Sequence, residues 1–553
     1  MSFGSNNEKG DKLTRAYDQK ILILGLDGAT WELIRPWAEE GYLPTFRKLM
    51  KIGAWGNLQS CIPPITLPAW ICMLTGKNPG KIGYIHFFAR DPNSYEFKIV
   101  QPKIEPLNPL WKLLKIGKDS KNVLLWIPTI PRDKYMDIYL PGEFVFGKVR
   151  LSALEKKLQE CIKVNDPPPS KHDVEYILWW TKYSEKQLDA IKRIIMTDEE
   201  DYPWDFIIGV IYSSDHINHL FWKYIDAAHP NYQERRDIYD AIKRYYTSID
   251  AKLGKIVEVC QKKKFFLFIV SDHGHGPLKW RVNLNRWLIN CGYMKIASFG
   301  SKRVSSKLFH YFIRKLASNA IIYRIYKKMP TVIKELIAEK IKPPTRIKTD
   351  GIDWNETRAY FAGYNGININ LKGREPKGIV DQTEYPKLLN ELKEKLNALS
   401  DSETKESIVE KVWTKYELYS GDRLEYLPDL IIQYKNESLY ESALGFDEPF
   451  LTNAPLFYPV DVSSAHRRNG IFLAYGPSIK HGEKIDIKIY DLTPTILHIF
   501  GLPIPSDIDG EVVLEIFEKD SIIVDRKPTY VEPGYYEKEL IKKKIKEIRK
   551  SIK

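Results

Sequence analysis

Three apolar runs of strand length each end in an aspartate, and this recurrence constrains the fold more than any other feature of the chain. The runs and their aspartates are Lys20 to Gly25 before Asp27, Trp204 to Tyr212 before Asp215, and Phe265 to Val270 before Asp272. Apolar runs without polar alternation are typical of parallel strands that are covered on both faces. Helical patterns lie between them, at Pro44 to Ile52 and at Tyr232 to Cys260. The sequence therefore predicts an α/β fold with a doubly wound, mostly parallel sheet.

The three aspartates and two nearby histidines are candidate metal ligands. In doubly wound sheets the ligand binds outside the carboxyl ends of the strands, which is where all three aspartates are expected. Asp215 and His219 are four residues apart, so they share a side if this segment is helical. Asp272 and His273 directly follow a buried run, where hydrophilic side chains are buried at a high cost unless they are paired or metal-bound. Two divalent ions about 3.5 to 4 Å apart would need such oxygen and nitrogen ligands.

A threonine precedes a predicted helix in a segment stiffened by prolines. Thr66 lies in the sequence IPPITLPAW, which covers residues 62 to 70. Its hydroxyl could cap the helix, because threonine is a common capping residue. It could also be an activated nucleophile if it lies beside the metal site. The combination with three strand-end acids favours the second interpretation.

The order of the patterns predicts a domain inserted into the sheet. After Asp272 come basic amphipathic helices, a Pro343-Pro344 break and a Gly-rich, strand-like stretch, and the core pattern returns near His466. The predicted segments are a polar tail at 1–19, the first part of the core at 20–276, an inserted cap at 277–459 with basic helices at 302–348, the second part of the core at 460–520, and a basic extension at 521–553. In that extension one helical stripe is apolar, with Ile541, Ile545, Ile548 and Ile552. We expect this stripe to pack against the core rather than to bind a membrane.

Composition narrows the class of protein and its surroundings. The chain has 553 residues, of which 43% are hydrophobic, so it is long enough for a large globular core with an insertion. It shows neither a signal peptide nor a membrane span, and its five cysteines form no CxxC pair, which predicts a cytoplasmic protein. Much of the net charge of +13 lies at 301–350, where thirteen Lys or Arg face three acids. We interpret this window as a solvated helix surface, with phosphate-rich substrates, nucleic acid or an anionic membrane as alternatives.

In these motifs the chain resembles the type I phosphodiesterase/nucleotide pyrophosphatase branch of the alkaline phosphatase superfamily. It is most similar to that superfamily's predicted archaeal and bacterial phosphohydrolases or phosphomutases. The motifs that carry the resemblance are LGLDG at 24–28, TLP at 66–68, TGKNP at 75–79, SDHINH at 214–219, SDHG at 271–274, His466 before GIF at 470–472, GREP at 373–376, PDL at 428–430, and DLTPT at 491–495 leading to DG at 509–510. They span most of the chain and occur in the expected order.

The resemblance implies an alkaline phosphatase-like core, a two-metal site and a covalent mechanism. One ion would be held by Asp215, His219 and His466. The other would be held by Asp27, Asp272, His273 and the Thr66 oxygen. Thr66 would attack phosphorus, and water would then hydrolyse the phosphothreonine. Histidine-rich ligation favours zinc, with manganese as the alternative.

The chain departs from the family pattern next to the nucleophile. Ala69 stands where family diesterases usually have an asparagine that donates to a phosphate oxygen. Some other group must then stabilise that oxygen, and the sequence offers Arg281, Lys279 and His275 as candidates. Substrate recognition is therefore expected to differ from that of nucleotide pyrophosphatases.

The predicted function is metal-dependent hydrolysis of phosphodiester or pyrophosphate bonds. A phosphomonoesterase or a phosphomutase would use the same metal site and differ in the cap. A rival of another class is a non-catalytic protein that binds membranes or nucleic acid. Retention of all the metal-ligand positions argues against that rival and makes a nucleic-acid partner the weaker expectation. The expected partner is a small phosphate ester or a lipid headgroup, with peripheral membrane contact as a further option, and the sequence leaves the oligomeric state open.

Overall fold

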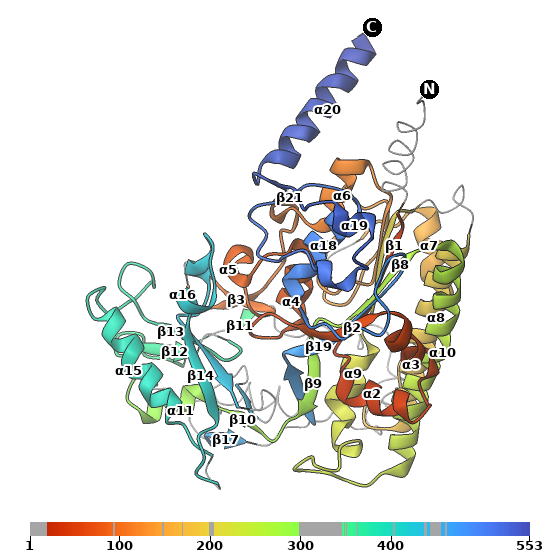
Figure 1. The fold of residues 1–553 in the computed structure, drawn as a ribbon. Helices are drawn as coiled ribbons and strands as arrows, with labels where there is room; N and C mark the ends of the chain where they lie inside the picture. Colours follow the sequence, from red (N-terminus) through yellow and green to blue (C-terminus); the bar gives the residue numbers. More distant parts are fainter. Residues whose placement is uncertain are drawn as a thin grey trace, which may run out of the picture.

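A large central sheet organises the computed structural model. The structure describes residues 19–91, 94–145, 149–168, 170–197, 204–297, 346–347, 349, 351–361, 363–401, 404–435, 440–442, 455–458 and 462–552. The sheet has eight strands in the order β20 (Ile487–Lys488), β2 (Ala54–Gln59), β19 (Asn469–Tyr475), β8 (Phe266–Val270), β1 (Ile21–Leu26), β7 (Phe206–Ile211), β5 (Asn122–Leu125) and β6 (Ile138–Leu140). Figure 1 labels β1, β2, β8 and β19 of this sheet. The five strands from β8 to β6 are parallel, and β19 is antiparallel to both of its neighbours. The predicted α/β fold with a mostly parallel sheet is confirmed.

The register of the three central strands brings their carboxyl ends together. Leu26 of β1 pairs with Ile211 of β7, and Gly25 pairs with Val270 of β8. Every residue of these three strands is buried, as the apolar runs predict. The segments that follow the three strands therefore leave the sheet at one edge.

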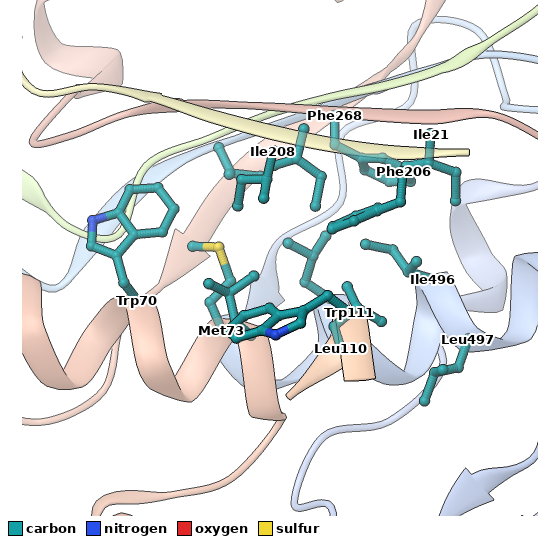
Figure 2. Close-up of a cluster of buried hydrophobic side chains, with 14 of the residues drawn as sticks. Ile21, Trp70, Met73, Leu110, Trp111, Phe206, Ile208, Phe268, Ile496 and Leu497 are labelled. Atoms are coloured by element: carbon teal, nitrogen blue, oxygen red, sulfur yellow. The ribbon is translucent and has the colours of Figure 1, made fainter. Parts of the chain in front are cut away.

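Alternate residues of the central strands face two hydrophobic cores. Ile21 and Ile23 belong to one core and Leu22 and Leu24 to the other, as the two-residue period of a strand requires. The first core is completed by α4 (Thr66–Thr75), α6 (Leu110–Lys118) and α18 (Leu492–Ile499). Figure 2 shows Trp70, Met73, Leu110, Trp111, Ile496 and Leu497 from these helices packed under the strands. The second core is covered by α2 (Trp31–Glu39), α3 (Pro44–Ile52), α7 (Ala153–Cys161), α8 (Val174–Met196) and α10 (Arg236–Lys263).

The inserted segment has a hydrophobic core of its own. Its sheet has the order β12 (Ala359–Phe361), β13 (Gly366–Ile369), β15 (Leu430–Tyr434) and β14 (Val409–Thr414). Helices α11 (Leu284–Asn290) and α15 (Tyr385–Asn397) pack with it. Tyr95 and Phe97 also belong to this core, although they precede the predicted insertion. Phe97 lies in β4 (Phe97–Ile99), which pairs with β3 (Phe88–Arg90) and β11 (Arg346–Ile347).

The C-terminal helix departs from its predicted packing. Helix α20 (Tyr535–Ile552) leaves the body of the protein and projects away from it (Figure 1). Ile541, Ile545 and Ile548 are 56%, 46% and 58% exposed. The expectation that this stripe packs against the core is wrong, because the helix uses a different face for its contacts with the body.

Two further predictions concern charge and membranes. Of the predicted basic helices at 302–348, only residues 346 and 347 fall within the described residues, as part of a strand, and the rest lie outside them. Among the helices described, none combines the length and the apolar character needed to cross a membrane.

Candidate active site

Two carboxylates and an imidazole meet at the ends of β1 and β8. Asp27 follows β1, and Asp272 and His273 follow β8; all three side chains are almost fully buried. His273 Nε2 lies 3.6 Å from an Asp27 oxygen and 3.3 Å from an Asp272 oxygen. Trp70 donates to Asp27 over 3.0 Å, and the Gly28 amide donates to Asp272 over 3.3 Å. The other oxygens, Asp27 Oδ1 and Asp272 Oδ2, are buried without a hydrogen-bond partner in the described structure.

A second group gathers around Asp215. The predicted helical segment is α9 (Ser213–Phe221), and it places Asp215 and His219 on one side as expected. Asp215 Oδ1 lies 3.4 Å from His219 Nε2, 3.4 Å from His466 Nε2 and 2.8 Å from His275 Nε2. His466 lies in β18 (Ser464–Arg467), which pairs with β9 (Gly274–Pro277) so that His466 is opposite His275. The rings of His466 and His273 stack with centroids 3.6 Å apart, which joins the two groups.

Backbone carbonyls set the tautomer of three of these imidazoles. The Nδ1 contacts are His219 to the Ser464 carbonyl at 3.0 Å, His273 to the Gly274 carbonyl at 3.2 Å, and His466 to the Pro64 carbonyl at 2.8 Å. A carbonyl only accepts, so we assign the proton of each neutral ring to Nδ1 and a lone pair to Nε2. Three nitrogen lone pairs thus point into the space among the carboxylates.

His275 has the same tautomer through a side-chain relay. The Ser464 hydroxyl donates to the Asn218 carbonyl over 2.9 Å, so it can accept from His275 Nδ1, which lies 2.8 Å away. His275 Nε2 then presents its lone pair to Asp215 Oδ1. His219 Nε2 and His466 Nε2 likewise face each other at 2.8 Å. Such contacts between acceptors are repulsive unless a cation lies among them, so the donor set fits divalent metal ions.

The carboxylates of the two groups differ in the direction in which their pKa values are shifted. Burial, together with the charge of Asp215, raises the pKa of Asp27 well above its ordinary value. Burial and the charge of Asp27 do the same for the pKa of Asp272. Burial also acts to raise the pKa of Asp215, but without a bound cation the charge of a protonated His219, followed by hydrogen bonds from the neighbouring histidines, holds it well below its ordinary value. Burial lowers the pKa of His273, and it lowers the pKa of His275 to about 3, so both rings are neutral.

Thr66 begins a helix that it does not cap, and its side chain lies beside the buried carboxylates and imidazoles. It is the first residue of α4, the N-cap is Ile65, and no side chain caps this helix. Thr66 is buried, and its Oγ1 lies 3.2 Å from His273 Nε2. The first N–H groups of a helix have no partner within the helix and favour negative charge. A phosphoryl group next to Thr66 would meet these groups.

Of the two clusters that could hold an ion, the one around Asp215 differs from the set the resemblance implies, because it lacks His219 and includes His273 and His275. One combines Asp27, Asp272 and His273, and the other combines Asp215, His273, His275 and His466. His219 lies directly against the second cluster through Asp215 and His466. All the site residues predicted from the sequence are therefore brought together, and His275 joins them.

His275 was predicted only as a candidate for contact with a phosphate oxygen. The signal for its place was the alternation His273-Gly274-His275, because residues two apart in an extended segment point to one side. Lys279 pairs instead with Asp401 of the inserted segment at 3.4 Å. Arg281 lies in β10 (Trp280–Val282), which pairs with β16 (Tyr440–Ser442) and β17 (Phe457–Tyr458). Their contribution to phosphate binding stays a prediction.

The inserted segment reaches the loop that carries Thr66. Tyr419 donates to the Ile62 carbonyl, four residues before Thr66. The ring of Tyr364, between β12 and β13, stacks on His86 with centroids 5.9 Å apart. Burial lowers the pKa of His86 to about 4. The inserted segment is thus in contact with two segments next to the site.

Comparisons with known proteins identify a matching family. The sequence model of a family described as type I phosphodiesterase / nucleotide pyrophosphatase matches residues 21–444. No curated protein matches the chain in sequence. Similar solved structures include murine ectonucleotide pyrophosphatase / phosphodiesterase 5 (13% identity, 90% of this chain and 100% of that chain, TM-score 0.48) and its human counterpart (13%, 90% and 98%, TM-score 0.47). A likeness of this degree supports no inference about function.

Proposed function

The chain belongs to the type I phosphodiesterase/nucleotide pyrophosphatase family of the alkaline phosphatase superfamily, and on this premise we propose that it cleaves phosphodiester or pyrophosphate bonds through a phosphothreonine. One observation carries the proposal. The Thr66 hydroxyl lies 3.2 Å from His273 Nε2, beside buried carboxylates and imidazole lone pairs that converge on a common space. A hydroxyl has little reason to be held there unless it takes part in metal-assisted chemistry.

The donor set would divide between two ions. Asp215, His219 and His466, with His275 beside them, would hold one, and Asp27, Asp272 and His273 would hold the other. The imidazoles favour zinc, and manganese would tolerate the carboxylates. When bound, the ions supply the positive charge that stabilises the negative charge developing on the phosphoryl group.

Thr66 performs the covalent part of the reaction. In the first step the Thr66 hydroxyl gives its proton to solvent and Oγ1 forms a bond to phosphorus. The bond from phosphorus to the leaving oxygen breaks with its electron pair going to that oxygen, which takes up a proton from solvent. In the second step a water oxygen bonds to phosphorus, the Oγ1–phosphorus bond breaks, and the Thr66 hydroxyl is restored. The amino end of α4 favours the negative charge of the transferred group in both steps.

Hydrolysis of two synthetic esters tests the proposal. Chelated wild type, Thr66→Ala and a control, Thr247→Ala, are supplied with zinc or manganese and assayed on bis-p-nitrophenyl phosphate and p-nitrophenyl phosphate. Thr247 is exposed on α10 and donates only to the Lys243 carbonyl, so its loss should leave activity unchanged. We expect metal-dependent turnover with the diester preferred, and a loss of about 10³-fold or more in Thr66→Ala.

Each outcome has a defined meaning. Preference for the monoester would favour a phosphomonoesterase. If metal-loaded wild type turned over neither ester, simple hydrolysis would be rejected and a phosphomutase would become the leading function. If Thr66→Ala kept its activity while binding metal normally by calorimetry, the covalent step at Thr66 would be rejected.

A further inference from the structure

The C-terminal helix has two faces with different surroundings. Tyr536 donates to the Pro503 carbonyl over 2.7 Å, and Lys543 donates to the Ile116 carbonyl over 2.5 Å. Leu540 packs against the first core. These residues recur at spacings of four and three, so they form one face of the helix, and this face holds α20 to the body. The amino-terminal half of α20 is therefore firmly attached.

The exposed isoleucines lie on the opposite face. At 3.6 residues per turn, Ile541, Ile545 and Ile548 point roughly away from the face that contains Leu540 and Lys543. Their exposed fractions of 46% to 58% agree with this geometry. Among the described residues, packing therefore leaves the side chains of the apolar stripe about half exposed, and the direction of the helix in Figure 1 carries them away from the body.

The charge beside the stripe is strongly positive. Residues 535–553 contain eight Lys or Arg and three Glu. Lys544 lies along one border of the stripe, and Lys542 and Arg549 lie along the other, as the helical period places them. The side chains at these borders are exposed. An apolar stripe bordered by cations matches the boundary between acyl chains and anionic headgroups.

A second copy of the helix is a poorer partner. The isoleucine spacings of four and three fit the seam of a coiled coil, but the described seam covers less than two heptads. In a paired helix Lys542, Lys544 and Arg549 would occupy the positions that flank the seam. Two copies would bring like charges together there in either orientation, which opposes pairing.

We propose that α20 docks this protein on an anionic lipid bilayer, with Ile541, Ile545 and Ile548 inserted at the headgroup boundary. The helix is attached beside α6, which leads into the amino end of β5, whereas the candidate active site lies at the carboxyl ends of the strands. Docking therefore leaves the active site accessible. The proposal is independent of the proposed reaction, because it rests on a helix that shares no residue with the site.

Vesicle co-sedimentation of the full chain tests the proposal. The vesicles are phosphatidylcholine alone or with about 30 mol% phosphatidylglycerol. The variants are Ile541→Glu/Ile545→Glu, Lys542→Glu/Lys544→Glu and the control Ile522→Glu. Ile522 is 43% exposed in α19 (Ile522–Asp525), so the control replaces an isoleucine of similar exposure outside the helix.

We expect wild type and Ile522→Glu to bind the anionic vesicles, and to bind phosphatidylcholine at least about tenfold more weakly. Both α20 variants should bind the anionic vesicles at least about tenfold more weakly than wild type, and high salt should weaken wild-type binding. Unchanged melting temperatures would show that the variants are folded. Equal binding by wild type and Ile541→Glu/Ile545→Glu, or no binding by wild type, would overturn the proposal. So would a dimeric wild type that the isoleucine substitutions make monomeric, because the stripe would then be a contact between copies.

Discussion

Two polar clusters of this protein differ in how the charge of their carboxylates is neutralised. The insert network consists of Arg90, Arg374, Glu375, Lys415 and Asp429. The catalytic cluster consists of Asp27, Asp215, Asp272, His219, His273, His275 and His466. Both place carboxylates away from water, where an unpaired charge is strongly unfavourable.

The insert network is neutralised by side chains of the chain itself. Arg374 makes two bonds of 2.6 Å to Asp429, and Lys415 lies 3.1 Å from the same carboxylate. Arg90 pairs with Glu375 at 2.6 Å. Burial acts to raise the pKa of Asp429, but Arg374 and Lys415 hold it well below its ordinary value.

The catalytic cluster contains no fixed cation among its residues. The histidines present lone pairs, and the pKa values of Asp27 and Asp272 are raised by burial and by neighbouring carboxylates. Neutralising its carboxylates therefore requires cations that bind from solution. The comparison indicates that a buried cluster completed by its own arginines and lysine is structural, whereas one that lacks them is built for a ligand.

The largest expected effect comes from breaking the insert network. Asp429→Asn should lower the free energy of unfolding by about 3 to 5 kcal/mol, because it leaves the buried Lys415 and the partly buried Arg374 without their shared partner. Urea denaturation with and without metal measures the effect, which should not depend on metal. The control is Asp381→Asn, whose pair with Lys372 is about half exposed and should contribute no more than about 0.5 kcal/mol. Equal effects of the two substitutions would contradict the structural role of the network.

Asp272→Asn should weaken metal binding and leave the stability of the metal-free protein intact, which is the reverse of the effect of Asp429→Asn. It removes a carboxylate from the catalytic cluster, so metal affinity should fall at least about a hundredfold, beyond the effect of losing an outer hydrogen-bond partner. The melting temperature of chelated protein should not fall, because the substitution relieves repulsion from Asp27. Added zinc should stabilise wild type and Asp429→Asn but not Asp272→Asn. A large loss of stability in the chelated variant would mean that Asp272 serves the fold instead.

A smaller effect should follow from Trp70→Phe. Trp70 orients Asp27 through a bond of 3.0 Å, and the loss of such a partner should weaken metal binding about tenfold. Trp111→Phe is the matched control, because this buried tryptophan donates over 2.7 Å to Asp133, which is not part of the site. Both substitutions should lower the melting temperature, and calorimetric titration with zinc should separate them. Equal metal affinities in the two variants would exclude an orienting role for Trp70.

The smallest expected effect is the pH dependence of the stability difference between wild type and Asp429→Asn. The pKa of Asp429 is lower in the folded protein than its ordinary value of 3.8. Its stabilising contribution is therefore present above about pH 4 and is lost as the pH falls through the folded pKa. The difference in unfolding free energy between wild type and Asp429→Asn should narrow as the pH falls from 4. A constant difference down to acid unfolding would show that the charge of Asp429 is not what stabilises the network.

The sequence by itself determined the sheet and most of the site. Continuous burial gave each of β1, β7 and β8 its apolar run, and the parallel arrangement then requires Asp27, Asp215 and Asp272 to lie at one edge. The four-residue spacing of Asp215 and His219 was enough to place both on one side of α9. The two-part core, the cytoplasmic location and the identity of the metal stay predictions.

Only the tertiary structure decided which polar groups contact one another. The contact of His275 with Asp215, the carbonyls that orient the imidazoles, and the contacts of the insert network join residues far apart in the chain, so no local periodicity records them. The local sequence likewise did not predict which face of the C-terminal helix packs against the body. Its isoleucine spacing predicted a helix with an apolar stripe, but the face that meets the body was decided by Tyr536, Leu540 and Lys543. Local patterns depend on the period of a helix or strand, whereas partners depend on how the whole chain packs.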